Sequence, residues 1–150
     1  MRAVVQRVSK AEVTIDREVV GSIGKGLVVL LAVGSGDGPD DLAFMTRKLV
    51  GLRIFNDSDG KLNLSVADVR AEILLISQFT LYGDCRKGNR PSFTRAAPPA
   101  EADETYQKLA EELRARGLRV ATGRFQAMMS VSLVNEGPVT LLIDSKKEFH

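Results

Sequence analysis

An uninterrupted apolar run near the start of the chain constrains its fold most strongly. Residues 27–33 read Leu-Val-Val-Leu-Leu-Ala-Val, without a single polar side chain. The run is too short for the roughly 20 residues that a membrane-spanning helix needs. Its β-branched content is typical of a strand buried on both faces. A second buried strand is expected over residues 73–79, which begin Ile-Leu-Leu-Ile.

Further strands and two helices are predicted around this pair. Apolar residues alternate with polar ones over residues 3–8 and 11–15, which predicts two extended segments. Helices are expected to begin at Pro39 and at Pro98-Pro99, because proline suits the first turn and apolar residues follow at helical spacing. The remaining predicted strands are short and cover residues 52–55, 118–121, 128–134 and 139–143.

These elements set the predicted fold class. Two helices among many strands predict an α+β fold with mixed or antiparallel sheets, in a barrel-like or two-layer core. With 150 residues and no linker-like stretch, the chain is expected to form one domain over residues 1–150.

Histidine and cysteine are too scarce for several kinds of active site. The only histidine is His150, the last residue, and the only cysteine is Cys85. A histidine-based triad, a multi-histidine metal site and an intramolecular disulfide are therefore not expected, and we predict no metal or cofactor. Cations beside Cys85 would favour a reactive thiolate, but the missing histidine partner argues against a catalytic thiol.

The charge pattern permits a nucleic-acid partner without requiring one. A net charge of +2 suits contact with a short RNA end better than a long electrostatic footprint, and DNA is not expected as a partner. Gln6 and Arg7 interrupt the first apolar residues, so we expect no signal peptide, no membrane contact and a cytoplasmic location. The acidic pairs at residues 40–41 and 111–112 are expected on solvated helix faces.

The first candidate site is the segment Ser77-Gln78-Phe79-Thr80. It follows a wholly apolar stretch, and a buried polar side chain needs a hydrogen-bond partner. One interpretation is that Ser77 and Thr80 bond to neighbouring backbone. The other is that the strand ends in a pocket, where Gln78 and the backbone face a ligand.

Two further segments could serve a site. Gly137-Pro138 is expected in a turn between the last two strands, because proline cannot join a central strand ladder. Taken alone, this turn reads as an ordinary hairpin connection. Four cations within ten residues could bind a phosphate backbone or form a solvated loop; they are Arg86, Lys87, Arg90 and Arg95.

Three segments together resemble the D-aminoacyl-tRNA deacylase family across the whole chain. Residues 1–8 are similar to the opening strand of that family, and residues 77–83 and 135–140 are similar to its two signatures. The resemblance implies a homodimer that hydrolyses the ester between a D-amino acid and the terminal ribose at the tRNA acceptor end. It also implies activity on glycyl-tRNA, including glycine mischarged on the alanine tRNA.

The resemblance also implies roles for single residues. The Gly137–Pro138 bond would be cis, and this dipeptide would reach from one subunit into the pocket of the other. Phe125 and Met129 would line that pocket, near the adenine and the aminoacyl group.

The residues near the first signature constrain the mechanism. A serine or threonine nucleophile needs an adjacent base, and no histidine, lysine or carboxylate lies beside residues 77–80 in the sequence, which disfavours an acyl-enzyme on Thr80. We expect the ribose hydroxyl next to the ester to activate water, while backbone N–H groups near Phe79 and Thr80 stabilise the oxyanion. Rigid carbonyls of Gly137-Pro138 would exclude an L side chain.

Two other functions remain open from the sequence. One is an esterase that uses Thr80 or Cys85 covalently. The other is a small RNA- or DNA-binding module without catalysis.

Overall fold

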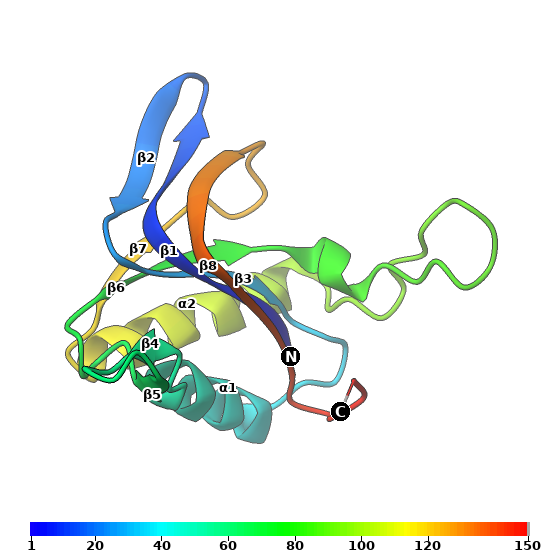
Figure 1. Ribbon diagram of the computed structural model, residues 1–150. Helices are drawn as coiled ribbons and strands as arrows, with labels where there is room; N and C mark the ends of the chain where they lie inside the picture. Colours follow the sequence, from blue (N-terminus) through cyan, green and yellow to red (C-terminus); the bar gives the residue numbers. More distant parts are fainter. Residues whose placement is uncertain (150) are drawn as a thin grey trace.

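The long strand β1 (Arg2–Ile15) organises the sheet in the computed structural model, which describes residues 1–149 (Figure 1). Its first half pairs antiparallel with β3 (Gly26–Ala32), and its second half with β2 (Glu18–Ile23). Along its other edge it pairs with β8 (Ser130–Asp144). The two extended segments expected from the sequence are therefore one strand. It changes its buried face at Val8, where it passes from one core cluster to a second.

The two apolar runs form the parallel centre of the sheet. β3 pairs parallel with β6 (Glu72–Ser77), and β6 pairs parallel with β7 (Arg119–Thr122). The resulting six-stranded sheet is mixed, in the order β2-β1-β3-β6-β7 with β8 on β1. The edge strands β2 and β7 approach closely, since a Cβ atom on Gly21 would lie 2.6 Å from the Thr122 carbonyl oxygen. The sheet is thus a nearly closed barrel, as the predicted α+β class allowed.

The helices α1 (Pro39–Gly51) and α2 (Pro99–Ala115) lie on the same side of the sheet (Figure 1). Both begin at the prolines that predicted them. Their apolar stripes are buried, with Leu49 and Leu109 completely inaccessible to solvent. Burying one such leucine stabilises a fold by about 1.5–3 kcal/mol. The helices cover the larger core cluster against β3 and β6.

Two short strands depart from the sequence prediction. The strand expected over residues 52–55 is wrong, because β4 (Phe55–Asn56) has only two residues. It pairs with β5 (Leu62–Leu64), which we did not predict. These two strands form a small separate sheet. They are too short to show a clear alternation of apolar and polar residues.

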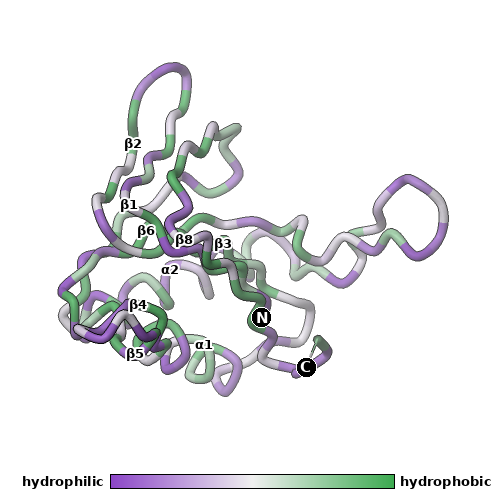
Figure 2. Tube along the Cα trace, viewed as in Figure 1, coloured by the Kyte–Doolittle hydropathy of each residue, from purple (hydrophilic) through white to green (hydrophobic). Residues whose placement is uncertain are grey.

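One loop projects away from the body of the protein. It spans residues 83–93, and most of it is hydrophilic (Figure 2). The two ends of the described chain lie near each other (Figure 1). None of the helices formed by residues 1–149 has the length and apolar character needed to span a membrane. His150, on which the argument about histidine chemistry depends, lies outside the described residues.

Candidate active site

Residues 77–80 lie where β6 leaves the sheet. Ser77 is the last residue of β6 and pairs with Leu31 of β3. The Gln78 N–H then donates to the Leu31 carbonyl oxygen at 2.7 Å. Phe79 begins the 3₁₀ helix η1 (Phe79–Tyr82), so the prediction of a strand reaching Phe79 is wrong by two residues. The strand pairing with β3 ends at Ser77, and the chain turns into η1 directly after Gln78.

The hydroxyl groups of this segment do not bond to the backbone. The Thr80 hydroxyl accepts a hydrogen bond from the side-chain amide of Gln78. No residue in the range 1–149 hydrogen-bonds the Ser77 hydroxyl. The interpretation in which Ser77 and Thr80 are satisfied by neighbouring backbone is therefore wrong, and the polar side chains stay available at the surface.

Two backbone donors are free at the start of η1. The N–H groups of Phe79 and Thr80 come first in this helix, where internal acceptors are lacking, and no other described residue accepts from them. The Phe79 side chain is 55% exposed and packs edge-to-face on Phe93, with ring centroids 5.1 Å apart. Paired N–H groups beside an aromatic wall can stabilise a developing oxyanion.

The segment after β7 reaches the same edge of the sheet. Since β6 and β7 are parallel and Leu75 lies opposite Thr122, both strands end side by side. The Phe125 ring packs on Tyr106 with centroids 6.3 Å apart. Burial raises the pKa of Tyr106 to about 12, so its hydroxyl stays protonated and donates to the Leu75 carbonyl oxygen at 2.8 Å. Met129 packs against the second core cluster.

Gly137 and Pro138 lie in a bulge of β8. The pairing with β1 skips from Asn135 to Thr140, so the residues between them leave the ladder. The predicted turn between two strands is therefore wrong: β8 is one strand, and the bulge spares proline a ladder hydrogen bond. The Gly137–Pro138 peptide bond is cis, as the resemblance implied, and both residues are exposed.

Arg7 of β1 supports this bulge through hydrogen bonds. Its side chain is buried, and its Nε donates to the Glu136 carbonyl oxygen at 3.1 Å. Its Nη1 donates to the Ile54 carbonyl oxygen at 2.9 Å and to Asn56 Oδ1 at 3.2 Å. We did not predict a role for Arg7. The available signal was a charged residue at a position where the alternation of β1 predicts burial.

Within one chain the two halves of the candidate site lie apart. β3 and β1 separate β6 from β8 in the sheet. Adjacent strands are about 4.8 Å apart, so the halves are about 14 Å apart across the sheet. Ser77 lies level with Ala3 and Glu136 level with Arg7, which adds about four residues, or roughly 13 Å, along the strands.

The four cations in and just after the projecting loop fall into two classes. Arg86 donates to both carboxylate oxygens of Asp84, at 2.9 Å and 2.6 Å, and these hydrogen bonds lower the pKa of Asp84. Arg95 donates to Glu148 at 2.5 Å. Lys87 and Arg90 are exposed and form no ion pair with any residue between 1 and 149. Of the four cations, only Lys87 and Arg90 have a charge that no described residue compensates.

The remaining cysteine and carboxylates of the described residues form no metal-binding cluster. Cys85 is exposed in the same loop. Within residues 1–149, no three His, Cys, Asp or Glu side chains are grouped so as to hold a metal ion.

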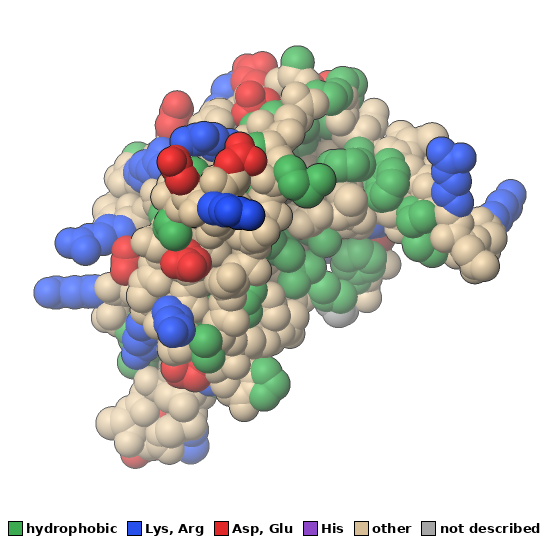
Figure 3. Space-filling view, turned by 90° about the horizontal axis from the view of Figure 1, so that it is seen from above, with side chains coloured by type: hydrophobic (Ala, Val, Ile, Leu, Met, Phe, Trp, Pro, Cys, Tyr) green, Lys and Arg blue, Asp and Glu red, His purple; other side chains and the backbone are tan. Residues whose placement is uncertain are grey.

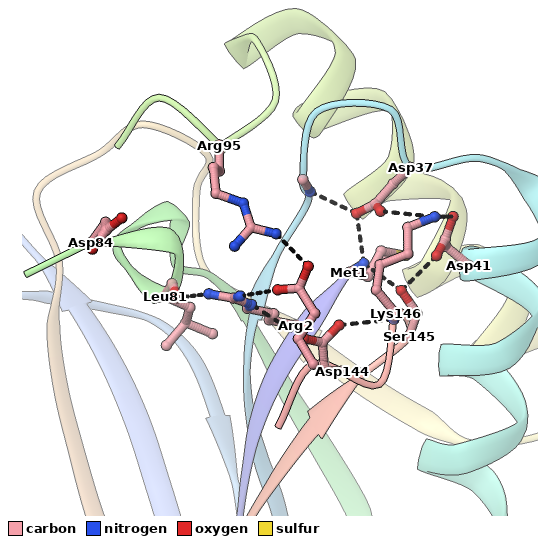
Figure 4. Close-up of polar contacts among 12 residues, drawn as sticks. Met1, Arg2, Asp37, Asp41, Leu81, Asp84, Arg95, Asp144, Ser145 and Lys146 are labelled. Atoms are coloured by element: carbon pink, nitrogen blue, oxygen red, sulfur yellow. Dashed lines mark hydrogen bonds and ion pairs between the residues drawn. The ribbon is translucent and has the colours of Figure 1, made fainter. Parts of the chain in front are cut away.

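The expectation that Asp41 lies on a solvated face is wrong, because it is 7% exposed and accepts hydrogen bonds from Ser145 and Lys146 (Figure 4). A cavity of about 450 Å³ nearby is lined by Asp37, among others, and contains none of residues 77–80.

Comparison with known proteins assigns a family to this arrangement. The family model described as D-Tyr-tRNA(Tyr) deacylase matches residues 4–144. A D-aminoacyl-tRNA deacylase of Desulfitobacterium hafniense is 61% identical over 149 residues, which are 99% of this chain and 100% of that protein. One from Thermotoga petrophila is 56% identical with the same coverage.

Solved structures agree with the fold. A protein named c-Myc DNA Unwinding Element Binding Protein is 42% identical, with a TM-score of 0.90 over 96% of this chain and 98% of that one. A probable eukaryotic D-amino acid tRNA deacylase superposes with a TM-score of 0.80 over 95% of this chain and 97% of that one. At 20% identity, the second supports the fold alone. Sequence, fold and relatives agree that this chain belongs to the D-aminoacyl-tRNA deacylase family and is a tRNA-editing hydrolase.

Proposed function

We propose that the enzyme cleaves D-aminoacyl-tRNA by hydrolysis assisted by the tRNA itself. The observation that carries this proposal is the pair of free N–H groups of Phe79 and Thr80 at the exposed start of η1. They would donate to the ester carbonyl oxygen as water attacks and negative charge develops there. Gln78 would contribute by fixing the Thr80 hydroxyl, and Ser77 by contacting substrate.

Residues 1–149 place no base against a protein nucleophile at this position. Among the described side chains, only the Gln78 amide hydrogen-bonds the Thr80 hydroxyl. The ribose hydroxyl next to the ester would instead orient the attacking water and relay a proton, accepting one from the water while it gives its own to the leaving ribose oxygen. Collapse of the tetrahedral intermediate breaks the bond between the carbonyl carbon and the ribose oxygen. That oxygen takes up the proton, and the free D-amino acid and tRNA leave.

A tRNA that ends in 2′-deoxyadenosine tests this mechanism. With the D-amino acid on the 3′ oxygen, the rate of hydrolysis is expected to fall at least about 100-fold, the typical size of an acid–base contribution. A matched tRNA ending in adenosine is the control. Unchanged cleavage of the deoxy substrate would overturn the proposed mechanism.

Chiral selection is assigned to the bulge of β8. Gly137 and Pro138 are exposed, and Arg7 fixes the neighbouring Glu136 carbonyl group, so backbone oxygens there have a defined direction. Placed in a substrate pocket, they would collide with an L side chain, whereas a D side chain points elsewhere and glycine has none. This supports D-aminoacyl-tRNA, and glycine mischarged on the alanine tRNA, as substrates.

A homodimer would bring the two halves together. In one chain the bulge lies far from η1, and the free edge of β8 carries exposed apolar side chains, among them Val131, Val134 and Leu142. Figure 3 shows hydrophobic side chains gathered across one face of the molecule. Long, apolar strand edges tend to pair with another chain. Pairing two copies would cover this edge and carry each Gly137-Pro138 into the partner's pocket. Sedimentation of the purified protein tests the dimer.

The acceptor end of tRNA is the expected RNA contact. Phe125 and Met129 follow β7 at the same edge as η1, where they could line the pocket for the adenine and the aminoacyl group. Lys87 and Arg90 carry uncompensated charge on the projecting loop and would bind backbone phosphates, with Arg86 and Arg95 serving mainly to shape it. Since aminoacyl-tRNA is used in translation, we propose that the enzyme acts in the cytoplasm.

Binding of a nucleic acid other than aminoacyl-tRNA is a second candidate function, beside the hydrolase activity that the family assigns. It is favoured by the name of one relative of 42% identity, which describes binding to a DNA unwinding element. An assay of matched D- and L-aminoacyl-tRNA, with duplex DNA added as competitor, distinguishes the two. Our proposal requires ester cleavage that excess duplex DNA does not abolish; salt-sensitive binding without cleavage would contradict it.

A further inference from the structure

We propose that Arg2 is a positioning residue that holds η1, and with it the oxyanion-binding N–H groups, in the catalytic position. This inference rests on the proposed function of η1. Arg2 comes from the start of β1 and lies at the far end of η1 from Phe79 and Thr80. It touches neither of the two residues that carry the free N–H groups.

Arg2 contacts η1 at two points. Its Nη1 donates to the Leu81 carbonyl oxygen at 3.1 Å. Its guanidinium carbon lies 4.5 Å from the centroid of the Tyr82 ring, within the range of a cation–π contact. The two partners are consecutive residues at the end of η1, so one side chain fixes both a carbonyl and a ring.

Arg2 is itself fixed from the C-terminal side of the chain (Figure 4). Its Nη2 donates to Glu148 Oε2 at 2.6 Å, and its Nε lies 3.4 Å from Asp144 Oδ2. The Phe149 ring covers the guanidinium, with its centroid 4.6 Å away. Carboxylates and rings around a side chain that is 11% exposed leave the guanidinium little freedom to move.

Tyr82 is wedged against the loop before α1. It is 5% exposed, and a Cβ atom on Gly34 would lie 2.5 Å from its hydroxyl oxygen. Burial, followed by the charges of Asp37 and Asp144, raises its pKa, so the ring remains neutral. Gly34 thus permits the close approach that lets Tyr82 stack on Arg2.

This arrangement bears on catalysis because η1 is a single turn. β6 fixes its beginning, and the contacts of Arg2 fix its end. A shift at Leu81 would rotate the whole turn and move the N–H groups of Phe79 and Thr80. Displacing catalytic groups by about 1 Å can cost on the order of 100-fold in rate.

Steady-state deacylation by Arg2→Met and Arg2→Lys tests the proposal. For Arg2→Met, kcat is expected to fall about 10- to 100-fold while KM changes less than about three-fold. Arg2→Lys should restore part of kcat, because lysine can still donate to Leu81 but does not stack as a planar group. A rise in KM with an unchanged kcat would overturn a positioning role.

Asp41→Asn provides the matched control for stability. Asp41 belongs to the neighbouring polar cluster around Met1, Ser145 and Lys146, but it has no contact with η1 (Figure 4). All variants are assayed at a temperature at which circular dichroism shows them folded. The proposal requires that Asp41→Asn keeps wild-type kcat even where it melts as early as Arg2→Met. An equal loss of kcat in both would overturn it.

Amide hydrogen exchange measures how firmly η1 is held, and it needs no substrate. Amide exchange over residues 78–83 should be faster in Arg2→Met than in wild type, and unchanged in Asp41→Asn. If exchange over these residues is the same in Arg2→Met as in wild type, Arg2 does not hold η1. An inactive wild-type enzyme would instead contradict the proposed function, while this exchange measurement still decides the role of Arg2.

Discussion

The two halves of the candidate site are built in opposite ways. η1 follows a parallel strand whose central residues are buried, and it is held at both ends by contacts within its own chain, including those of Arg2. The bulge around Gly137 interrupts an exposed edge strand and is held by one buried side chain, Arg7. The first half is therefore exposed but anchored to the core through β6 and Tyr82, whereas the second projects outwards.

This difference indicates a division of labour. Oxyanion stabilisation needs donors in fixed positions, which a helix turn packed onto the core provides. Rejection of L substrates needs only an obstacle in the right place, which backbone atoms of a projecting bulge can supply whatever the substrate side chain. An element that faces outwards can serve a pocket in a second subunit, and in the proposed dimer η1 serves the pocket of its own subunit.

The largest effect is expected from Gly137→Ala. Gly137 has φ +128°, and a Cβ atom there would lie 2.9 Å from Arg7 Nη2 and 2.9 Å from Val139 Cγ2. The bulge must shift, so we expect cleavage of D-aminoacyl-tRNA to fall at least about 100-fold and the preference for D over L substrates to shrink. Initial rates on matched D and L substrates measure both. Wild-type rate and selectivity in this variant would remove the bulge from the site.

The double variant Lys87→Ala, Arg90→Ala should act on binding alone. These cations carry uncompensated charge on the projecting loop and belong to neither half of the site, so KM for tRNA is expected to rise about 10-fold with little change in kcat. The dependence of kcat/KM on salt should also weaken, by a slope of about 2. Arg86→Ala is the control, because Asp84 already neutralises Arg86. A larger effect in the control would reverse the assignment.

Thr80→Ala distinguishes the contribution of the Thr80 N–H group to kcat from that of its hydroxyl group. Since alanine keeps the backbone donor, we expect kcat within about five-fold of wild type. Loss of a covalent nucleophile would instead lower kcat by a factor on the order of 10⁴ or more. Rapid-quench assays for an acyl adduct, with Cys85→Ala in parallel, complete this test.

The smallest expected effect is on stability alone, and it comes from Asp41, which lies outside both halves of the site. Burial alone would raise the pKa of Asp41, but hydrogen bonds from Ser145, Gly38 and Lys146 lower it from 3.8 to about 2. A lowered carboxyl pKa stabilises the fold above its unfolded value, and this stabilisation is lost as pH falls through the folded value. Between about pH 5 and pH 2, wild type should lose about 2 kcal/mol more unfolding free energy than Asp41→Asn. Equal losses in urea titrations would contradict this.

The core half of the site was more predictable than the exposed half. Long apolar runs specify β3 and β6, although β6 ends at Ser77 and not at Phe79 as predicted. The local pattern of apolar and polar residues does not distinguish the turn into η1 at Phe79 from a continuing strand.

The exposed half depends on contacts distant in sequence. Proline indicated that the ladder breaks near Pro138, but a bulge and a hairpin share that signal. Arg7 lies well over a hundred residues from Glu136, and only the pairing of β1 with β8 brings them together. Similarly, the partners of Asp41 come from the far end of the chain, so its burial could not be read from the helix that carries it.

Subunit complementation tests the central claim that each site combines η1 of one subunit with the bulge of the other. Thr80→Pro removes one oxyanion donor, Gly137→Ala displaces the bulge, and each homodimer is expected to be inactive. A heterodimer of the two, isolated through different affinity tags, should recover about half of the wild-type rate, because one of its two sites is then intact. A heterodimer as inactive as its parents would contradict the account.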